Sequence, residues 1–478
     1  MRLALVAVVA LCVSGCSSGR ATGATPSPLA PLSSVAGPSV VAGGDAPSVT
    51  PGAPDTGTGA PASAALQVEQ DVLANIGQNG WDSAAGLNGG LGQLWINWRT
   101  GSTPLSTNWN NVPAAECTVG GGGTPQCTSS PPRTDRLTDL RYLHALALYR
   151  NQHPGDTRFD AQFSRWAGIV KSLWGRPRDE RGWTYEVLVD ITRLTGDGFY
   201  AAAAAQQAHY YSATVFHASC GCLYFTDTAH PRGFYRPVDT VEEAAALAEE
   251  GARTGNQTYI AQARTALQFL LAHGYLRAWH AFPYAWDQVL NADGSVNSSP
   301  VFAAGLPNAG QEVRVIWLAQ EAQTLLHATR ATGDTRYSTL ATELLDAITP
   351  AQNTLGLWDS AHGGYCEKAT FSGSGLAQPG SPSVGCSKKE AGRQLVVLDA
   401  VRVAATVGLG SRYADLQQRM TALAVGPDYY SHGAGYVYEV APDYSLFLNH
   451  SVPEDWVTTE ADGIALEALF ALSDPSPW

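Results

Sequence analysis

The sequence predicts an all-α fold in which helical hairpins close into an (α/α)6 toroid. From residue 66 onward, alanine and leucine recur at helical spacing, and few stretches alternate as strands do. A short signature of glycine, a polar residue and an aromatic residue recurs along this region and divides it into pairs of helices. Such repetition of one supersecondary unit is typical of a solenoid or of a closed ring.

Each position of the recurring signature has a physical reason. The signature is complete in Gly155-Asp156-Thr157-Arg158-Phe159 and returns at residues 196–200, 255–259 and 333–337, with a shortened form at 410–413. The glycine takes the left-handed conformation that ends one helix. The Asp, Asn or Ser that follows caps the next helix, and the aromatic residue packs back between the two helices.

A predicted helix precedes each signature and another follows it. The preceding helices span residues 134–151, 179–194, 240–253, 309–331 and 388–405, and the following helices begin near residues 158, 199, 258, 336 and 413. A sixth helix of the preceding type spans 459–472, and an unpaired helix at 66–77 can close against it. We favour the toroid over an open solenoid, because its ends meet and its long loops collect on one face to form a cleft.

The first 65 residues divide into a targeting segment and a tether. Met1-Arg2 precedes an apolar run, Leu3 to Val13, that is too short to cross a bilayer and therefore predicts a signal peptide. The segment resembles a bacterial lipoprotein signal, which implies that Cys16 is lipidated at the end of residues 1–16; an ordinary secretory signal is the alternative. Residues 17–65 are almost all small or Pro, so we predict a disordered tether that holds a domain at 66–478 outside the cell membrane.

Composition narrows the class of ligand. Charged residues make up only 15% of the chain, the formal net charge is −13, and there are 13 Trp and 19 Tyr. A nucleic-acid partner is excluded, because phosphate binding needs a basic surface. Neutral ligands with flat apolar faces suit this composition, and carbohydrates are the obvious class.

Cysteines in the predicted domain indicate disulfides outside the cell. They are Cys117, Cys127, Cys220, Cys222, Cys366 and Cys386. We expect Cys117 to pair with Cys127 and Cys366 with Cys386, whereas a bridge between Cys220 and Cys222 would be strained. A zinc site is the alternative, but no CxxC pair or nearby His spacing supports it.

Polar residues, mostly carboxylates, stand at the predicted starts of the inner helices. They are Asp135 and Asp139, Asp179 and Glu180, Glu242 and Glu243, Gln311 and Glu312, Lys389 and Glu390, and Glu460 and Asp462. Acidic residues near helix N-termini are favoured by capping and by the helix dipole, so a structural role explains most of them singly. Together they would form a ring of carboxylates around one pocket.

Asp179 and Glu180 are the candidate catalytic residues in that ring. On a helix, Trp183 shares their face and Glu186 lies one turn deeper. Repulsion between close carboxylates raises the proton affinity of one of them, which provides an acid and a base. In glycosidic cleavage one carboxyl protonates the leaving oxygen while the other attacks carbon or activates water, and a short separation favours the retaining route.

Aromatic and polar residues near the loop face are predicted to bind substrate. Beside Trp183 and Glu186 they are Trp95, Trp98, Trp286, Asp287, Gln311, Glu312, Trp358 and Trp456. Trp faces stack on sugar rings while acids and amides hold hydroxyl groups, and a core role is the alternative for each Trp taken singly.

Residues 179–183, with Leu188, 194–197 and Tyr200, resemble glycoside hydrolase family 76. The resemblance implies a secreted endo-α-1,6-mannanase with an (α/α)6 fold, in which Asp179 matches the first catalytic Asp and Glu180 the second. The chain departs from the family pattern by having Glu at 180, and Thr184 where a second Trp is common. The Asn308–Gln311 segment is also similar to an Asn-x-Gly segment of that family.

The segment Trp358–Tyr365 resembles Gly-Gly-aromatic loops of six-hairpin glycosidases and sugar epimerases. A sugar epimerase is one alternative, although such an enzyme needs a pair of His residues near the cleft, and the sequence does not indicate one. An unsaturated uronide hydrolase is another, and Arg133, Arg136 and Arg181 are available for a substrate carboxylate. A lipoprotein that only captures oligosaccharides is the third.

No HExxH motif and no phosphate-binding loop occurs in the sequence, and its Gly-x-Ser-x-Gly pattern, Gly15–Gly19, lies outside the predicted domain at 66–478. We therefore expect a hydrolase that needs no metal and no other cofactor. The resemblance implies an endo-acting, retaining enzyme for an α-linked polysaccharide or oligosaccharide, and we expect a monomer.

Overall fold

The computed structural model describes most of the chain from residue 59 to residue 474. The described residues are 59–79, 81–82, 93–94, 97–99, 117–119, 125–127, 136–174, 182–224, 231–303, 311–372, 376, 380–426, 435–449, 452–453 and 456–474. The segments at 1–16 and 17–58 lie outside them, so the predictions of a signal peptide and of lipidation at Cys16 stay predictions.

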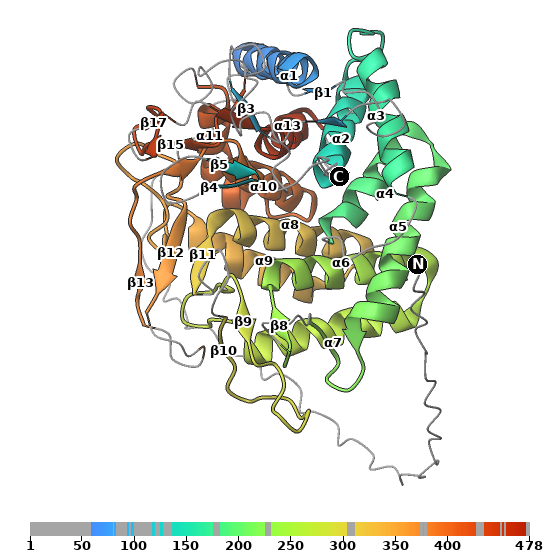
Figure 1. The fold of residues 1–478 in the computed structure, drawn as a ribbon, viewed down its shortest axis with the longest axis vertical. Coiled ribbons are helices and arrows are strands. Elements are labelled where there is room, and N and C mark those ends of the chain that lie inside the picture. Colours follow the sequence, from blue (N-terminus) through green and yellow to red (C-terminus); the bar gives the residue numbers. More distant parts are fainter. Residues whose placement is uncertain are drawn as a thin grey trace, which may run out of the picture. The chain divides into compact units, whose positions relative to one another are not determined.

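Six helices of the described chain form the inner ring. They are α2 (Arg136–Gln152), α4 (Trp183–Thr195), α6 (Pro237–Thr254), α8 (Val315–Thr332), α10 (Val396–Thr406) and α13 (Thr459–Ser473). Each packs against the next, and α13 packs back on α2, as can be followed in Figure 1. The ring is therefore closed, which confirms the predicted toroid.

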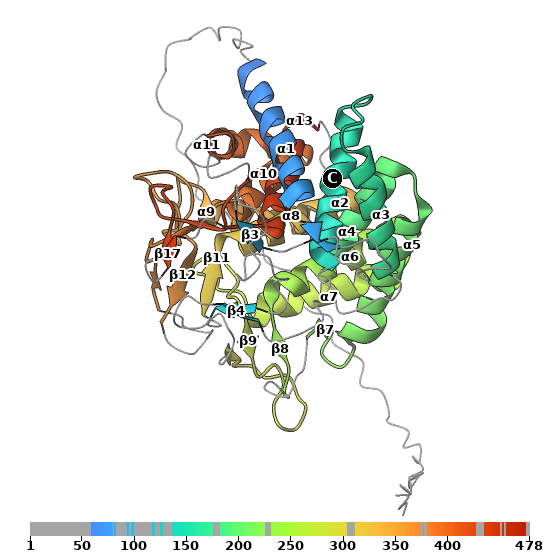
Figure 2. The same ribbon diagram turned by 45° about the horizontal axis from the view of Figure 1, so that its top comes forward.

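A second set of helices covers the inner ring from outside. These are α3 (Asp160–Leu173), α5 (Gly198–Tyr210), α7 (Gln257–His273), α9 (Thr335–Ile348), α11 (Ala414–Ala424) and α1 (Gly59–Asn79). Each of the first five packs on the inner helix before it, and α1 packs on α13 (Figure 2). The helix α1 begins seven residues before the predicted residue 66, so its first turns occupy the end of the predicted tether.

Burial follows from this two-layer arrangement. Almost every residue of α8 from Val315 to Thr329 is buried, because the helix is covered on the inside and the outside of the ring. The outer helix α9 buries a single stripe that includes Tyr337, Leu340, Ala341 and Leu344, as expected of a surface helix. The inner helices therefore carry the polar groups of the interior in fixed positions.

The predicted signature forms the turns between paired helices. Gly155, Gly196, Gly255 and Gly333 have φ angles of 97°, 70°, 74° and 69°. Asp197, Asn256 and Asp334 accept hydrogen bonds from backbone N–H groups of the helices that follow them. At the fifth turn Gly408, with φ of 86°, takes the left-handed position, and Gly410 instead begins a 3-10 helix, Gly410–Tyr413.

The long loops contain short strands that pair into small sheets. On one side, β11 (Glu312–Arg314), β12 (Lys368–Phe371) and β13 (Pro382–Ser383) form one sheet, and β14 (Lys389–Glu390) pairs with β15 (Glu439–Val440). Another sheet contains β8 (Phe234–Tyr235), β9 (Trp286–Asp287) and β10 (Val301–Phe302). The inner helices predicted to begin at residues 309 and 388 begin only at 315 and 396, because strand residues precede them.

The remaining strands form antiparallel pairs. They are β1 (Trp81–Asp82) with β2 (Gln93–Leu94), β3 (Asn97–Arg99) with β18 (Trp456–Thr458), β4 (Cys117–Val119) with β5 (Pro125–Cys127), β6 (Phe216–His217) with β7 (Cys222–Leu223), and β16 (Leu448–Asn449) with β17 (Val452–Pro453). A π-helix, Tyr211–Val215, continues α5, and a 3-10 helix, Arg393–Leu395, precedes α10.

Two cysteine pairs lie at disulfide distance. The pairing of Cys366 with Cys386 confirms the prediction. Cys220 also lies at disulfide distance from Cys222, a pairing that we did not expect from the sequence. Cys117 faces Cys127 in the register of β4 and β5, but their side chains lie outside the described part. Within that part, no helix is both long and apolar enough to span a membrane.

Candidate active site

A cavity of about 400 Å³ opens where the inner helices begin. It is lined by Arg236, Tyr284, Arg314, Ile316, Trp317, Gln320, Glu367, Lys388, Arg393, Tyr438, Glu439, Glu460 and Ile464. These residues come from the N-terminal ends of α6, α8 and α13 and from the loops and short strands beside them. The cavity therefore lies on the loop-rich face, where we predicted a pocket from the sequence.

Arg314 of β11 is the centre of the ion pairs around this cavity. Its guanidinium lies 2.8 Å from Glu367, 3.2 Å from Glu312 and 3.3 Å from Glu390. The Arg314 side chain is 8% exposed, so these charges interact in surroundings that screen them weakly. Lys368 adds a second cation to Glu312.

Arg393 and Lys388 extend the network across the cavity. Arg393 lies 3.2 Å from Glu390, pairs with Glu460, and lies 3.3 Å from the Tyr438 hydroxyl. Lys388 lies 3.3 Å from Glu367 and pairs with Glu439. Each carboxylate of this ion-pair network therefore contacts at least one cation.

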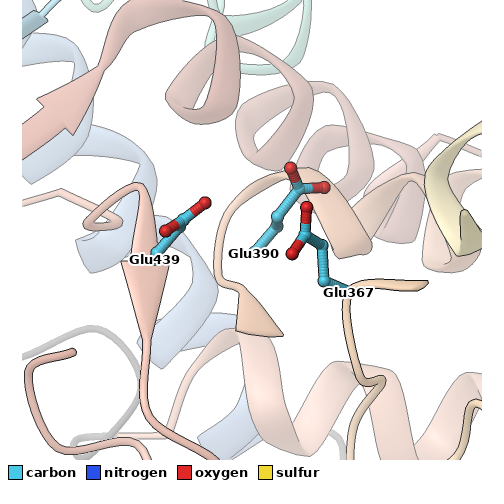
Figure 3. Close-up of side chains that lie close together, drawn as sticks. All are labelled: Glu367, Glu390 and Glu439. Carbon is cyan, nitrogen blue, oxygen red and sulfur yellow. The ribbon is translucent and has the colours of Figure 1, made fainter. Parts of the chain in front are cut away.

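Three carboxylates in the network are close enough to hold a cation. Ligand atoms of Glu367, Glu390 and Glu439 all lie within 4.8 Å of one another, and Figure 3 shows their side chains converging. Arg314, Arg393 and Lys388 already pair with these three groups. The arrangement is therefore a charge-balanced ion-pair network, and we assign no metal to it.

A second group of acids lies buried beside the cavity. Asp239 and Glu242 of α6 and Glu321 of α8 are at most 6% exposed. Burial, together with the charges of Glu242 and Asp239, raises the pKa of Glu321 well above its ordinary range. Arg236, which lines the cavity, lies 3.1 Å from Asp239 and joins the two groups.

Sequence reasoning missed Asp239 and Glu321 as site residues. Glu321 lies in the middle of α8, whereas the predicted ring of carboxylates contains only residues at helix starts. The available signal was a carboxylate within a helix that begins with the apolar residues 315–319, where burial forces it either to pair or to stay protonated. Asp239 precedes the predicted helix start at residue 240, so the predicted ring of carboxylates does not include it.

The predicted catalytic pair, Asp179 and Glu180, lies outside the described residues. The described chain resumes at Gly182, which lies against α6: a Cβ placed there would come within 2.1 Å of the Glu242 carbonyl carbon. The Trp183 amide nitrogen lies 3.4 Å from a Glu242 carboxyl oxygen. The start of α4 is therefore packed tightly on the segment of α6 that carries the buried acids.

Trp183 and Glu186 lie in the interior of the ring. Trp183 is 6% exposed, and the Arg141 guanidinium lies 3.9 Å from its ring centroid. Glu186 is 4% exposed; burial and then the charges of Glu249 and Glu242 raise its pKa well above the ordinary range. Neither residue belongs to the cavity lining, although both were predicted to bind substrate.

Trp286 has a different place from the one predicted. It is completely buried and stacks on Tyr235 at a centroid distance of 4.4 Å, so neither face of its ring is available to a sugar. Its burial corrects the predicted substrate-binding role to a core role. Asp287 follows it in β9, away from the cavity lining.

The other predicted residues divide between the network and the surrounding loops. Glu312 joins the ion pairs of Arg314, and Gln311 precedes it at partial exposure. Trp358 packs edge-to-face on Tyr365, with ring centroids 5.0 Å apart, outside the lining. Side chains of Trp95, Trp98 and Trp456 lie outside the described part, although β3 and β18 pair with each other.

Besides Tyr438, the cavity lining contains two aromatic residues, Tyr284 and Trp317, that stack on each other. Their rings stack at a centroid distance of 4.3 Å, and the Arg314 guanidinium lies 5.0 Å from the Trp317 ring centroid. Both come from segments next to predicted residues, but only the folded loops bring them together.

Similar folds occur among solved structures of sugar-cleaving enzymes. An unsaturated glucuronyl hydrolase specific for heparin shares 14% identity at a TM-score of 0.58, over 86% of this chain and 96% of that one. A family 76 glycoside hydrolase from a bovine Bacteroides thetaiotaomicron strain shares 12% identity at a TM-score of 0.56, over 86% and 77%. An unsaturated glucuronyl hydrolase from Bacillus sp. GL1 shares 13% identity at a TM-score of 0.55, over 87% and 98%.

These similarities concern the fold. No protein-family model matches the sequence, and no curated protein matches it. The solved structures nevertheless extend over most of the chain, and both enzyme classes share its ring of helical hairpins. The chain therefore has the (α/α)6 toroid fold of these glycosidases.

Proposed function

We propose that this protein is a glycoside hydrolase that cleaves an α-linked, mannan-like polysaccharide at the loop-face cavity. The observation that carries the proposal is the convergence of inner-helix starts, paired charges and buried acids on one cavity. Sugar hydroxyl groups exchange hydrogen bonds with such carboxylates and guanidinium groups, and the stacked Tyr284 and Trp317 offer an apolar surface. The shared toroid with two classes of glycosidase supports the same function.

Asp179 and Glu180 provide the catalytic carboxyl groups in this proposal. One donates its proton to the departing glycosidic oxygen, and the other attacks the anomeric carbon, which gives a retaining mechanism. Repulsion between the two adjacent carboxyl groups raises the pKa of one of them, which can then act as the acid. Endo action follows from the family resemblance and is part of the proposal.

An unsaturated uronide hydrolase is the second candidate, and one observation favours it. Four cations, Arg236, Arg314, Lys388 and Arg393, line the cavity against three carboxylates, Glu367, Glu439 and Glu460. Guanidinium and ammonium groups at a cavity suit the carboxylate of an acidic sugar. Two of the three solved structures described above are unsaturated glucuronyl hydrolases.

A substrate panel distinguishes these candidates. The purified protein is incubated with α-1,6-mannan, a β-glucan, an arabinan and unsaturated uronide disaccharides, and new reducing ends are measured. Release from mannan supports the first proposal, and loss of the ultraviolet absorbance of the unsaturated uronide supports the second. An enzyme-free control corrects for spontaneous hydrolysis. If no substrate releases reducing ends, the hydrolase proposal is wrong.

A further inference from the structure

One buried lysine connects a loop outside the cavity to a strand that forms its wall. The Lys389 side chain is completely buried, and its Nζ lies 2.9 Å from Asp359 Oδ2. It also donates hydrogen bonds of 2.6 Å to the carbonyl oxygens of Gly363 and Pro442. Three partners satisfy the three donors of the ammonium group, so this cation is fixed in one place.

The neighbours of Lys389 in sequence point the other way, into the ion-pair network. Lys388 pairs with Glu367 and Glu439, and Glu390 pairs with Arg314 and Arg393. Such alternation is expected of a strand. In the register of β14 and β15, Lys389 faces Val440 and Glu390 faces Glu439. The position of Lys389 therefore sets the position of two strands that carry cavity residues.

Tyr444 completes the attachment in a conformation that a tyrosine rarely adopts. Its φ angle is 67°, a backbone region that is costly for a bulky residue. The Tyr444 hydroxyl donates to the Gly363 carbonyl oxygen at 2.6 Å, and the Lys389 Nζ lies 4.4 Å from its ring centroid. These contacts hold the strained residue in place.

The two glycines of the segment Trp358–Tyr365 are both required by their backbone conformation, and Gly364 is also required by close packing. Gly363 and Gly364 both have φ angles of 73°. A Cβ at Gly364 would lie 2.5 Å from the Tyr444 hydroxyl and 2.9 Å from the Gln394 side-chain oxygen. The Gly-Gly-aromatic motif is thus explained by close packing against Tyr444, and it does not contribute to the cavity lining.

We propose that Lys389, Asp359, Gly363 and Tyr444 form a clamp that positions the β14–β15 wall of the cavity for substrate binding. The inference rests on the proposed function, because it assigns substrate binding to that wall. Lys389 is the positioning residue of the clamp, since it acts through Lys388, Glu390 and Glu439. An apolar side chain would be less costly to bury than this ammonium, but it could not join the two loops to the strand.

The test compares Lys389→Met with Lys171→Met. Lys171 forms an exposed ion pair with Asp197 at a turn of the opposite face, so the control removes the same charge without touching the clamp. For the glycan cleaved by the wild type, we expect Lys389→Met to raise KM about tenfold with kcat changed less than about threefold, the pattern of lost binding. Lys171→Met should leave both constants unchanged.

Amide hydrogen exchange provides a readout that does not depend on activity. In Lys389→Met we expect faster exchange at residues 389–391 and 436–440 and unchanged exchange in α3 and α5. If no glycan is cleaved, the proposed function fails, while exchange at these residues still decides whether Lys389 fixes the wall. Unchanged exchange at the wall overturns the clamp.

Gly364→Ala serves as the second variant if Lys389→Met does not fold. It displaces Tyr444 by contact with the new methyl group while Lys389 is retained. The same rise in KM and faster wall exchange are expected. An unchanged KM in a folded variant whose wall exchanges faster would show that the clamp contributes only to stability, and the positioning role would be wrong.

Discussion

Arg314 shows how a single residue unites distant parts of the chain. Its partners Glu312, Glu367 and Glu390 come from three segments, and the charge is almost fully buried among them. Taking such charges out of water costs several kcal/mol per ion, and close pairing offsets that cost. The pairing therefore stabilises the fold only while both signs of charge are present.

Removal of Arg314 should consequently be destabilising. We expect Arg314→Leu to lower the free energy of unfolding by about 3–5 kcal/mol, because three carboxylates lose their shared partner in a buried site. Arg419→Leu is the matched control: it breaks an exposed pair with Asp415 and should cost less than about 1 kcal/mol. Urea unfolding measures both values, and equal losses in the two variants would contradict the role of the network.

At this scale the sequence predicted residue types better than residue roles. Local patterns placed carboxylates at Glu312, Glu390 and Glu460, and the structure brings all three into the network. The partners could not be predicted, because Arg314 and Arg393 meet them only through long-range folding. The predicted substrate-binding role of Trp286 was wrong for a related reason: its ring is buried against Tyr235, about fifty residues away in sequence.

Among the elements, α2, α4 and α13 meet through one histidine. His144 of α2 lies 2.8 Å from Glu467 of α13 and 2.9 Å from Asp190 of α4. Burial alone would lower the pKa of His144, but hydrogen bonds to both carboxylates and their charges raise it to about 9. The imidazolium thus links the last inner helix to the first two.

This link predicts a dependence of stability on pH. Because the folded pKa exceeds the unfolded value of 6.5, the contribution of His144 is complete below pH 6.5 and is lost as pH rises through about 9. Within that window one proton gives a slope of about 1.4 kcal/mol per pH unit. Urea unfolding from pH 6 to pH 10 should show this loss in the wild type.

A pair of variants isolates the contribution of His144. His144→Gln should flatten the slope between pH 6.5 and pH 9, whereas the exposed His209→Gln should retain it. Burial also raises the pKa of Glu69 and Glu249, to about 7 and 8, so those two acids contribute to both curves equally. Identical slopes in wild type and His144→Gln would contradict the assignment.

Helices were more predictable than the loops between them. The helix at 459–472 and those after the glycine turns agree with the structure within a few residues, because apolar periodicity and caps are local. The starts at 309 and 388 were wrong because β11 and β14 take their hydrogen bonds from partners at 368–370 and 439–440. No local pattern specifies those partners.

For the whole molecule, ring closure turns local repeats into a site. Five recurring turns and one unpaired helix at each end were sufficient to predict the toroid. The cavity could be placed on the loop face by the same reasoning, since all inner helices begin there. The residues that line the cavity could not be predicted. Glu367, Lys388 and Glu439 lie in or next to short strands, and the pairing of those strands depends on the closed ring.

The most direct test of the account is hydrolysis by carboxylate variants of the substrate that the panel identifies. We expect Asp179→Asn and Glu180→Gln each to reduce the release of reducing ends by about 100-fold to 10,000-fold, the range for loss of general acid–base catalysis. Helicity and melting temperature should not change, and the exposed Asp415→Asn should keep full activity. Near wild-type hydrolysis by either Asp179→Asn or Glu180→Gln would contradict the central claim.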